Sequence, residues 1–410
     1  MFIRLFLSSA LILPLIGIMQ MEAGEYGASI GMEGHRNYAS EAFAAFMLLA
    51  WLAYLFFGAT AFRPPAAAGA EPVPDVARFR SILTIGTWVL GIAALIMVFF
   101  FGGINVISGA MDRGLFRANL GMFGSLAYFI IKFLAPGIVA GILFFGRGVH
   151  KRAIDRIGIA LAVAFAMLIA LSFGYKGGLV TLFLPTLIAM QPKLTLKRIL
   201  IGISMFFGTV FAGYFVFETL EETDISFVFS LLLTRVTVLT GDVSWRMWDL
   251  LMAGEPFPSY AATLPAILGD RVLSAISGIG PEQAYDWVML HSSLVPTYLS
   301  GYSPEEIVEG GHNNTATSFS EGILFGGIPG IAVFAVLTGL ILRMTISWLE
   351  NAVAKRNYAS ACVAACFAMH CTWAWIISGG INMILHISVA FNLALLYVIL
   401  SLIFNAHRQR

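Results

Sequence analysis

Charged residues are scarce in this chain of 410 residues. Asp, Glu, Lys and Arg make up 11% of the sequence, whereas soluble domains carry about 25% charged residues. Hydrophobic residues account for 59%, and a soluble core of this size would need a far more polar shell. The composition therefore excludes an ordinary soluble protein and favours one embedded in a lipid bilayer. The net charge is only +1, and we expect no nucleic-acid partner.

Cysteine is also rare, and the common cofactor motifs are missing. Three cysteines, Cys362, Cys366 and Cys371, lie in one apolar stretch, which argues against a disulfide scaffold. With His370 they have roughly helical spacing, but a structural metal site would usually bring a second, distant pair of ligands. We interpret them as small, polarizable packing residues. The sequence has no P-loop, no dinucleotide-binding glycine motif and no D-x-D pair. We therefore expect no bound metal and no cofactor.

Long apolar runs predict an all-α, polytopic membrane helix bundle of about ten transmembrane helices. A helix needs about 20 apolar residues to cross the hydrocarbon layer. The first run follows a single arginine and has the pattern of a signal peptide as well as of a span. We expect it to stay uncleaved, because the run is long and no small-x-small site follows it. The predicted spans are 3–21, 41–61, 81–102, 121–146, 157–173, 177–191, 199–218, 321–342, 357–377 and 382–404.

The basic residues predict the orientation of these spans. Sixteen of the 24 Lys and Arg residues fall on one set of alternate connections, at Arg4, Arg63, Arg78, Arg80, Arg147, Lys151, Arg152, Arg156, Lys193, Lys197, Arg198, Arg343, Lys355, Arg356, Arg408 and Arg410. Cytoplasmic loops of membrane proteins carry an excess of Lys and Arg. We therefore expect a multi-pass inner-membrane protein with both termini in the cytoplasm.

One long connection divides the chain. Residues 1–218 hold the first seven predicted spans, 219–320 form a large periplasmic loop, and 321–410 hold the last three spans and a cytoplasmic tail. The loop is not a polar linker, because 227–239 and 243–254 have the pattern of amphipathic helices. Asp242 and Ser244 are candidate N-caps of the second. Several Trp and Tyr residues of the loop are typical of a segment at the membrane interface.

The few basic residues on the outer side are candidates for binding an anion. A cation in or near the membrane is costly unless it meets a negative charge, and the guanidinium fork of arginine matches phosphate oxygens. The alternatives are that these side chains reach lipid head groups or pair with Asp112, Asp242 or Asp249. Lys132 lies inside a predicted span. The candidates near the outer membrane boundary are Arg113, Arg117, Lys176, Arg235 and Arg246.

The stretch GGHNNTATSFSEGILFGGIPG (310–330) is the candidate for chemistry. His312 and Asn313 lie beside glycines where the long loop re-enters the membrane. Histidine titrates near neutral pH and can take a proton from a hydroxyl. Glu321 lies at the start of a predicted helix, where the helix dipole favours its charged form. The alternative is that His312 and Asn313 only cap this helix.

These features resemble the O-antigen polymerases, within a superfamily that also includes the O-antigen ligases. The resemblance covers most of the chain as architecture: ten to twelve spans, cytoplasmic ends and one large periplasmic loop in the second half. Locally it is carried by GYKGG, by Arg113 with Gly124 eleven positions later, and by GGHNNT…SEGILFGGIPG. The last is similar to the H-N-x-x-L…E-x-G-x-x-G region of the ligases, although Thr315 and Ala316 stand near the position of the usual leucine.

The resemblance implies a glycosyl transfer at the outer face of the inner membrane. The substrates would be oligosaccharide repeat units linked to undecaprenyl pyrophosphate, with the pyrophosphate among the outer cations and His312 as general base. Further partners would be a chain-length regulator and a flippase of the same pathway. Two alternatives stay open: a ligase that transfers glycan to lipid A core, and a transporter or flippase of a lipid-linked anion.

Overall fold

The computed structural model describes most of the membrane region. It covers residues 2–27, 30–60, 76–111, 123–147, 151–174, 178–191, 237–255 and 316–405, with 116, 120, 149, 195, 234, 274, 275 and 278 between them. The predicted span 199–218 and most of the predicted helix 227–239 lie outside these residues.

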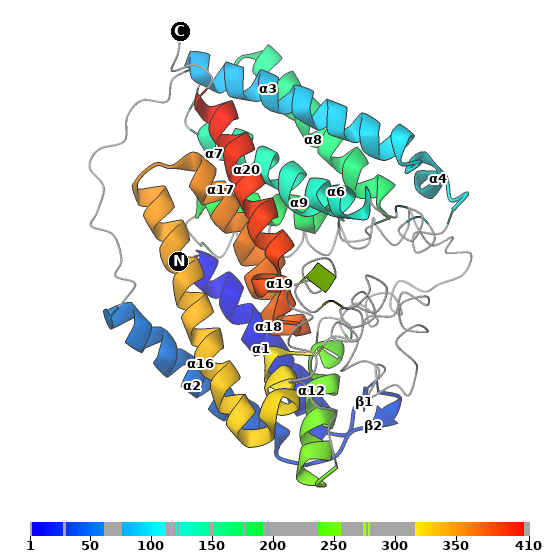
Figure 1. Ribbon diagram of the computed structural model, residues 1–410, viewed down its shortest axis with the longest axis vertical. Coiled ribbons are helices and arrows are strands. Elements are labelled where there is room, and N and C mark those ends of the chain that lie inside the picture. The colour runs from blue at the N-terminus through cyan, green and yellow to red at the C-terminus, as the bar shows by residue number, and fades with distance from the viewer. Residues whose placement is uncertain are drawn as a thin grey trace.

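The described part of the chain is almost entirely helical (Figure 1). Eight of its helices are long and apolar enough to cross a membrane, which confirms a multi-pass, all-α membrane protein. The long helices and their continuations are α1 (Phe2–Glu22), α2 (Ala39–Thr60), α3 (Val76–Leu95) with η1 (Ile96–Phe100), α6 (Gly124–Phe129) with η3 (Ile130–Leu134) and α7 (Ala135–Phe145), α8 (Ala153–Ser172), α16 (Ser318–Ala354), α17 (Tyr358–Phe367) with η5 (Ala368–Trp373) and α18 (Ala374–Ser378), and α20 (Ile387–Asn405). Here η marks a π-helical turn.

The remaining elements are short. The predicted span 177–191 corresponds to α9 (Gly178–Met190), which has only 13 residues, and the predicted loop helix 243–254 corresponds to α12 (Val238–Met252). Two further helices are α4 (Ile104–Ile107) and α19 (Asn382–Leu385). The strands β1 (Tyr26–Gly27) and β2 (Met32–Glu33) form a small antiparallel ribbon with Tyr26 opposite Glu33.

The helices pack around two apolar cores. One core holds side chains of α1, α2, α12 and α16, which lie mainly in the lower half of Figure 1, with the end of α16 rising toward α17. The other holds side chains of α3, α7, α8 and α20, in the upper half of the same view. The α17 helix serves both cores, because Ala361 and Ala365 face the first whereas Cys362 and Cys366 face the second. The burial of all three cysteines supports their role as packing residues.

Glycines let helices of the first core approach closely. Close packing matters for membrane helices because the hydrophobic effect does not drive their association within lipid. A Cβ at Gly339 of α16 would lie 2.2 Å from the carbonyl oxygen of Ala50 in α2. Gly17 of α1 meets Gly241 of α12, where a Cβ on Gly17 would lie 2.9 Å from the Gly241 nitrogen. The loop helix α12 is therefore packed directly on α1.

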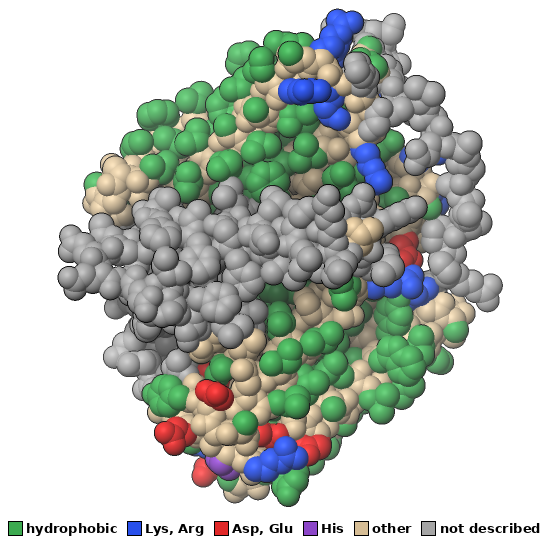
Figure 2. All heavy atoms as spheres, turned by 180° about the vertical axis from the view of Figure 1, so that it is seen from behind, with side chains coloured by type: hydrophobic (Ala, Val, Ile, Leu, Met, Phe, Trp, Pro, Cys, Tyr) green, Lys and Arg blue, Asp and Glu red, His purple; other side chains and the backbone are tan. Residues whose placement is uncertain are grey.

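Ends predicted to share one side of the membrane lie together. Arg4 pairs with Glu350 at 2.8 Å, and Arg80 pairs with Asp155 at 2.9 Å. At the other end, Arg36 pairs with Glu22 at 2.9 Å. Figure 2 shows acidic side chains gathered at the lower end of the molecule and Lys and Arg mainly toward the upper right, with hydrophobic side chains between. The contacts at each end agree with the predicted pairing of connections, and the side of the membrane that each end faces stays a prediction.

The prediction of one continuous span over 321–342 is wrong. The helical geometry of α16 breaks at Gly326 and Gly327, and Gly327 has φ +62°. The chain folds back there, because Thr338 donates to Ser318 Oγ at 3.5 Å, whereas 20 residues of straight helix would separate them by about 30 Å. Residues 318–325 thus form a short re-entrant helix along the longer one. The break is allowed because the short helix is buried in protein, from Ser318 to Leu324.

The longer part of α16 also runs past its predicted end. Arg343 is not in a connection but inside the helix, 7% exposed, because the helix continues to Ala354. Its Nη1 donates to the Tyr54 hydroxyl at 3.2 Å, and its guanidinium lies over the Tyr54 ring. Hydrogen bonding and ring contact let a charged side chain remain in the apolar segment.

Candidate functional site

The loop helix α12 is joined to the start of the re-entrant helix by buried hydroxyl groups. Ser244 Oγ lies 2.7 Å from Thr317 Oγ1 and 2.9 Å from Ser320 Oγ, and all three side chains are buried. Thr317 is the N-cap of α16 and accepts from the backbone N–H of Ser320 at 3.4 Å. Because Ser244 lies two residues before Arg246 and Thr317 five residues after His312, two stretches that supply candidate residues meet here.

This arrangement corrects the predicted caps of the loop helix. The helix begins at Val238 with Thr237 at the N-cap position, so Asp242 and Ser244 lie in its interior. Asp242 is fully buried, and its Oδ1 accepts from the backbone N–H of Val243 at 2.7 Å. The apolar start of the helix, Val238–Gly241, packs on α1, and that tertiary contact extends the helix beyond the start indicated by local capping signals.

Glu321 lies on the re-entrant helix and is 2% exposed. Its Oε2 accepts from the indole N–H of Trp375 at 2.8 Å, and its Oε1 accepts from the backbone N–H of Ile381 at 2.8 Å. The buried carboxylate is thereby satisfied by neutral donors. These contacts bind the re-entrant helix to the end of α18, 60 residues further along the chain.

The end of α18 is shaped to meet Glu321. The helix stops at Ser378, and Gly379 and Gly380 follow with φ of 71° and 80°. Such angles suit glycine and turn the backbone sharply. A Cβ at Gly379 would lie 2.3 Å from the carbonyl oxygen of Ala316, and Ala316 N donates to the carbonyl of Ser378 at 3.2 Å. The two backbones therefore touch just where the long loop returns to the membrane.

Arg246 projects from α12 into a cluster with Asp249 and His35. Its Nη1 donates to Asp249 Oδ2 at 2.5 Å, and His35 Nε2 lies 3.1 Å from Asp249 Oδ1. The pairing with Asp249 is one of the alternatives to an anion site. Only one of the five guanidinium N–H groups is used in this contact, and the side chain is 30% exposed. Among the described residues, Asp249 is the one carboxylate that pairs with Arg246.

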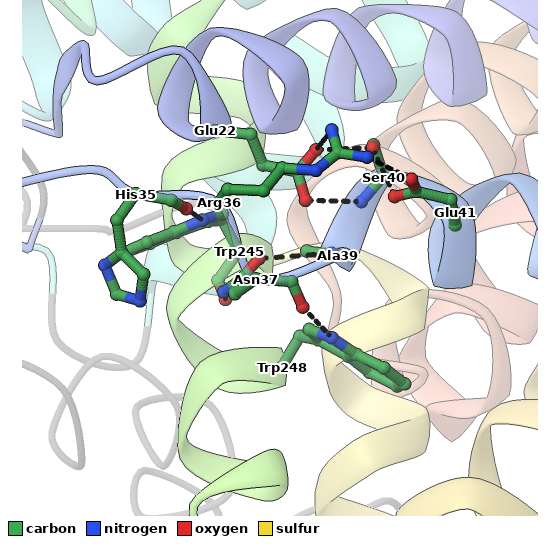
Figure 3. A network of polar contacts seen from close by, with 9 residues as sticks. All are labelled: Glu22, His35, Arg36, Asn37, Ala39, Ser40, Glu41, Trp245 and Trp248. Atoms are coloured by element: carbon green, nitrogen blue, oxygen red, sulfur yellow. Dashed lines mark hydrogen bonds and ion pairs between the residues drawn. The ribbon is translucent and has the colours of Figure 1, made fainter.

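A polar network fixes the loop between α1 and α2 against α12 (Figure 3). Trp245 Nε1 donates to the carbonyl of His35, and Trp248 Nε1 donates to the carbonyl of Asn37, both at 3.0 Å. In the same network Arg36 donates to Glu22 and to Glu41. These contacts join the neighbouring ends of α1, α2 and α12 in one polar layer. Trp245 and Trp248 were the sequence signals for this polar layer, but by themselves they indicated only a segment at the membrane interface.

The structure thus describes two of the eight candidate residues, Glu321 and Arg246. The other six lie outside the described residues: His312, Asn313, Arg113, Arg117, Lys176 and Arg235. Sequence reasoning missed His35 and Trp375, because their roles depend on contacts across 214 and 54 residues.

Lys132 lies in the π-helical turn η3, within the span Gly124–Phe145. Its Nζ is 5.1 Å from the centre of the Tyr128 ring, and no carboxylate of the described residues pairs with it. Among the residues that the structure describes, no group of three or more His, Cys, Asp and Glu is placed to hold a metal ion.

Comparison of the chain with protein-family models, with curated proteins and with solved structures gives no match.

Proposed function

We propose that this protein is a membrane glycosyltransferase that joins oligosaccharide units carried on a polyprenyl pyrophosphate, at the outer face of the inner membrane. The observation that carries the proposal is the contact between Ser244 and Thr317. It brings the stretch with Arg246, suited to an anion, beside Thr317 at the start of α16. His312 precedes Thr317 by five positions in the sequence, which supports a phosphate site and a base close to each other.

The reaction needs a leaving group, an attacking hydroxyl and a proton acceptor. A hydroxyl of one lipid-linked unit attacks the anomeric carbon of another. The new glycosidic bond forms as the bond from that carbon to the pyrophosphate oxygen breaks, and the lipid pyrophosphate departs. Arginine side chains such as Arg246 stabilise its growing negative charge. His312 takes the hydroxyl proton, a role that contributes about 10²–10⁴-fold to the rate.

Glu321 supports this chemistry by position. Glu321 lies nine residues after His312 in the sequence. Its buried carboxylate holds the re-entrant helix to Trp375 and Ile381. A carboxylate engaged in this way orients the end of the loop rather than meeting the sugar. In this proposal Glu321 therefore positions His312 and does not itself take part in the reaction.

The test is polymerisation by the purified full chain in proteoliposomes. Lipid-linked repeat units should be converted to longer lipid-linked glycans, with release of polyprenyl pyrophosphate, in excess chelator as in its absence. Loss of activity in chelator, restored by magnesium or manganese, would contradict the arginine-based account. In cells, deletion of the gene should leave surface glycan with single repeat units. Complete loss of attached glycan would instead identify a ligase.

Transport of a lipid-linked anion is the second candidate, favoured by two observations. Lys132 lies inside a span without a carboxylate partner among the described residues, and α16 is broken at Gly326 and Gly327. Broken helices and charged side chains within the membrane are common in transporters. The same proteoliposomes decide between the functions: a transporter would move a fluorescent lipid-linked oligosaccharide between leaflets without changing its length.

A further inference from the structure

A groove of about 400 Å³ lies between the first halves of α3 and α8. Its lining includes Arg80, Thr84 and Trp88 of α3, and Ile157, Gly158 and Leu161 of α8. The three α3 residues are spaced four apart and so share one face of that helix. The groove therefore runs along the helices rather than across them.

Gly158 lets α3 and α8 pack closely beneath the groove. A Cβ at Gly158 would lie 3.0 Å from Leu83 Cδ2, so the two helices are in contact along its floor. Its rims are apolar and outward-facing: Trp88 is 70% exposed, Ile157 is 55% and Leu161 is 48%. In a helix that crosses the membrane, such side chains face lipid. An acyl chain is the occupant whose chemistry suits these rims.

The mouth of the groove is basic. Arg80 makes two contacts with Asp155, Nε to Oδ1 at 2.9 Å and Nη2 to Oδ2 at 3.2 Å. Both oxygens of the Asp155 carboxylate are engaged by Arg80, and the Asp155 side chain is only 3% exposed. Arg152 also lines the groove, and it is exposed at the N-cap of α8. The mouth thus carries two guanidinium groups against one carboxylate. Figure 2 shows Lys and Arg side chains gathered at this end of the molecule.

We propose that this groove binds an anionic glycerophospholipid of the cytoplasmic leaflet. Its phosphate lies between Arg80 and Arg152, and one acyl chain follows Thr84 and Trp88 toward Leu161. From Arg80 to Trp88 the helix rises about 12 Å, which is the length of a substantial part of an acyl chain. A soluble phosphate would use only the mouth and would leave the apolar rims without a partner. The site is separate from glycosyl transfer and does not depend on it.

The test is native mass spectrometry of the full chain in detergent, with phosphatidylglycerol and phosphatidylcholine of identical acyl chains. Phosphatidylglycerol should be retained in preference. Arg152→Gln should weaken that preference about fivefold, the equivalent of the about 1 kcal/mol that one basic residue contributes at an anionic lipid surface. Thr84→Trp keeps every charge but fills the groove, and it should abolish the preference. Lys355→Gln removes an exposed cation outside the groove and should change nothing.

Several results would overturn the proposal. Equal retention of both lipids would show only a general lipid annulus. An equal loss in Lys355→Gln and Arg152→Gln would show attraction by overall charge. Displacement of the lipid by millimolar inorganic phosphate would show a soluble-anion site. If Arg152→Gln elutes as an aggregate, Thr84→Trp decides the question, because its exposed position accepts a larger side chain without disturbing the packing.

Discussion

Glu321→Gln should destabilise the protein far more than a matched substitution in the longer helix of α16. The native carboxylate accepts from the indole of Trp375 and from the amide of Ile381 in a buried site. Gln keeps one acceptor oxygen but turns an NH₂ group toward the second donor. Leaving one buried donor unsatisfied costs about 1–3 kcal/mol of unfolding free energy. Glu321→Ala loses both acceptors and should cost about 2–6 kcal/mol by the same reasoning.

The control is Glu350→Gln, near the other end of α16. Glu350 pairs with Arg4, whose side chain is 54% exposed, and exposed pairs contribute about 0–1 kcal/mol. Unfolding is followed by circular dichroism during titration of mixed micelles with dodecyl sulfate. If Glu321→Gln costs no more than Glu350→Gln, the carboxylate does not hold the two donors. In a Trp375→Phe background the Gln substitution should cost less, because one competing donor is gone.

Three further predictions concern topology and chemistry. A reporter active only in the periplasm should be active when fused near Gly269 and silent near Lys151, and activity at Lys151 would reverse the orientation. His312→Ala should lower turnover about 10²–10⁴-fold with nearly normal binding of the lipid donor, and by more than Glu321→Gln does; full-length polymer from the alanine variant would exclude His312 as the base. Arg246→Lys should fail almost as badly as Arg246→Ala in the polymerisation assay, because an ammonium cannot replace the fork. Full activity of Arg246→Lys at normal protein level would indicate that its contact with Asp249 is its whole role.

The spans could be predicted from sequence because hydropathy is a local property. Predicted edges at 3–21 and 41–61 agree with α1 and α2 to within two residues. The break in α16 could not be found in that way, because GILFGGIPG is as apolar and glycine-rich as an ordinary packed span. The reversal is shown by tertiary contacts such as that of Ser318 with Thr338.

The residue types of the candidate site could be predicted from the sequence, but the residues that they contact could not. Local sequence indicated that Arg246 would meet either an anion or a nearby aspartate, since Asp249 lies three residues away on the same helical face. The start of α12 was misplaced, because its contact with α1 is non-local and no capping signal reports it. The donors to Glu321 were hidden for the same reason, since Trp375 and Ile381 belong to another span.

The glycine contact between α1 and α12 has a consequence for the order of biosynthesis. Gly17 and Gly241 are 224 positions apart, and at about 5–20 residues per second the ribosome needs roughly 10–45 s to make the intervening chain. Throughout that delay the narrow face of α1 around Gly17 lacks its final neighbour. Lipid or the insertion machinery must occupy it meanwhile and then be displaced. Any bulkier residue at Gly17 would leave insertion of α1 intact but would block the later docking step, so the defect would first appear after the second half of the chain is made.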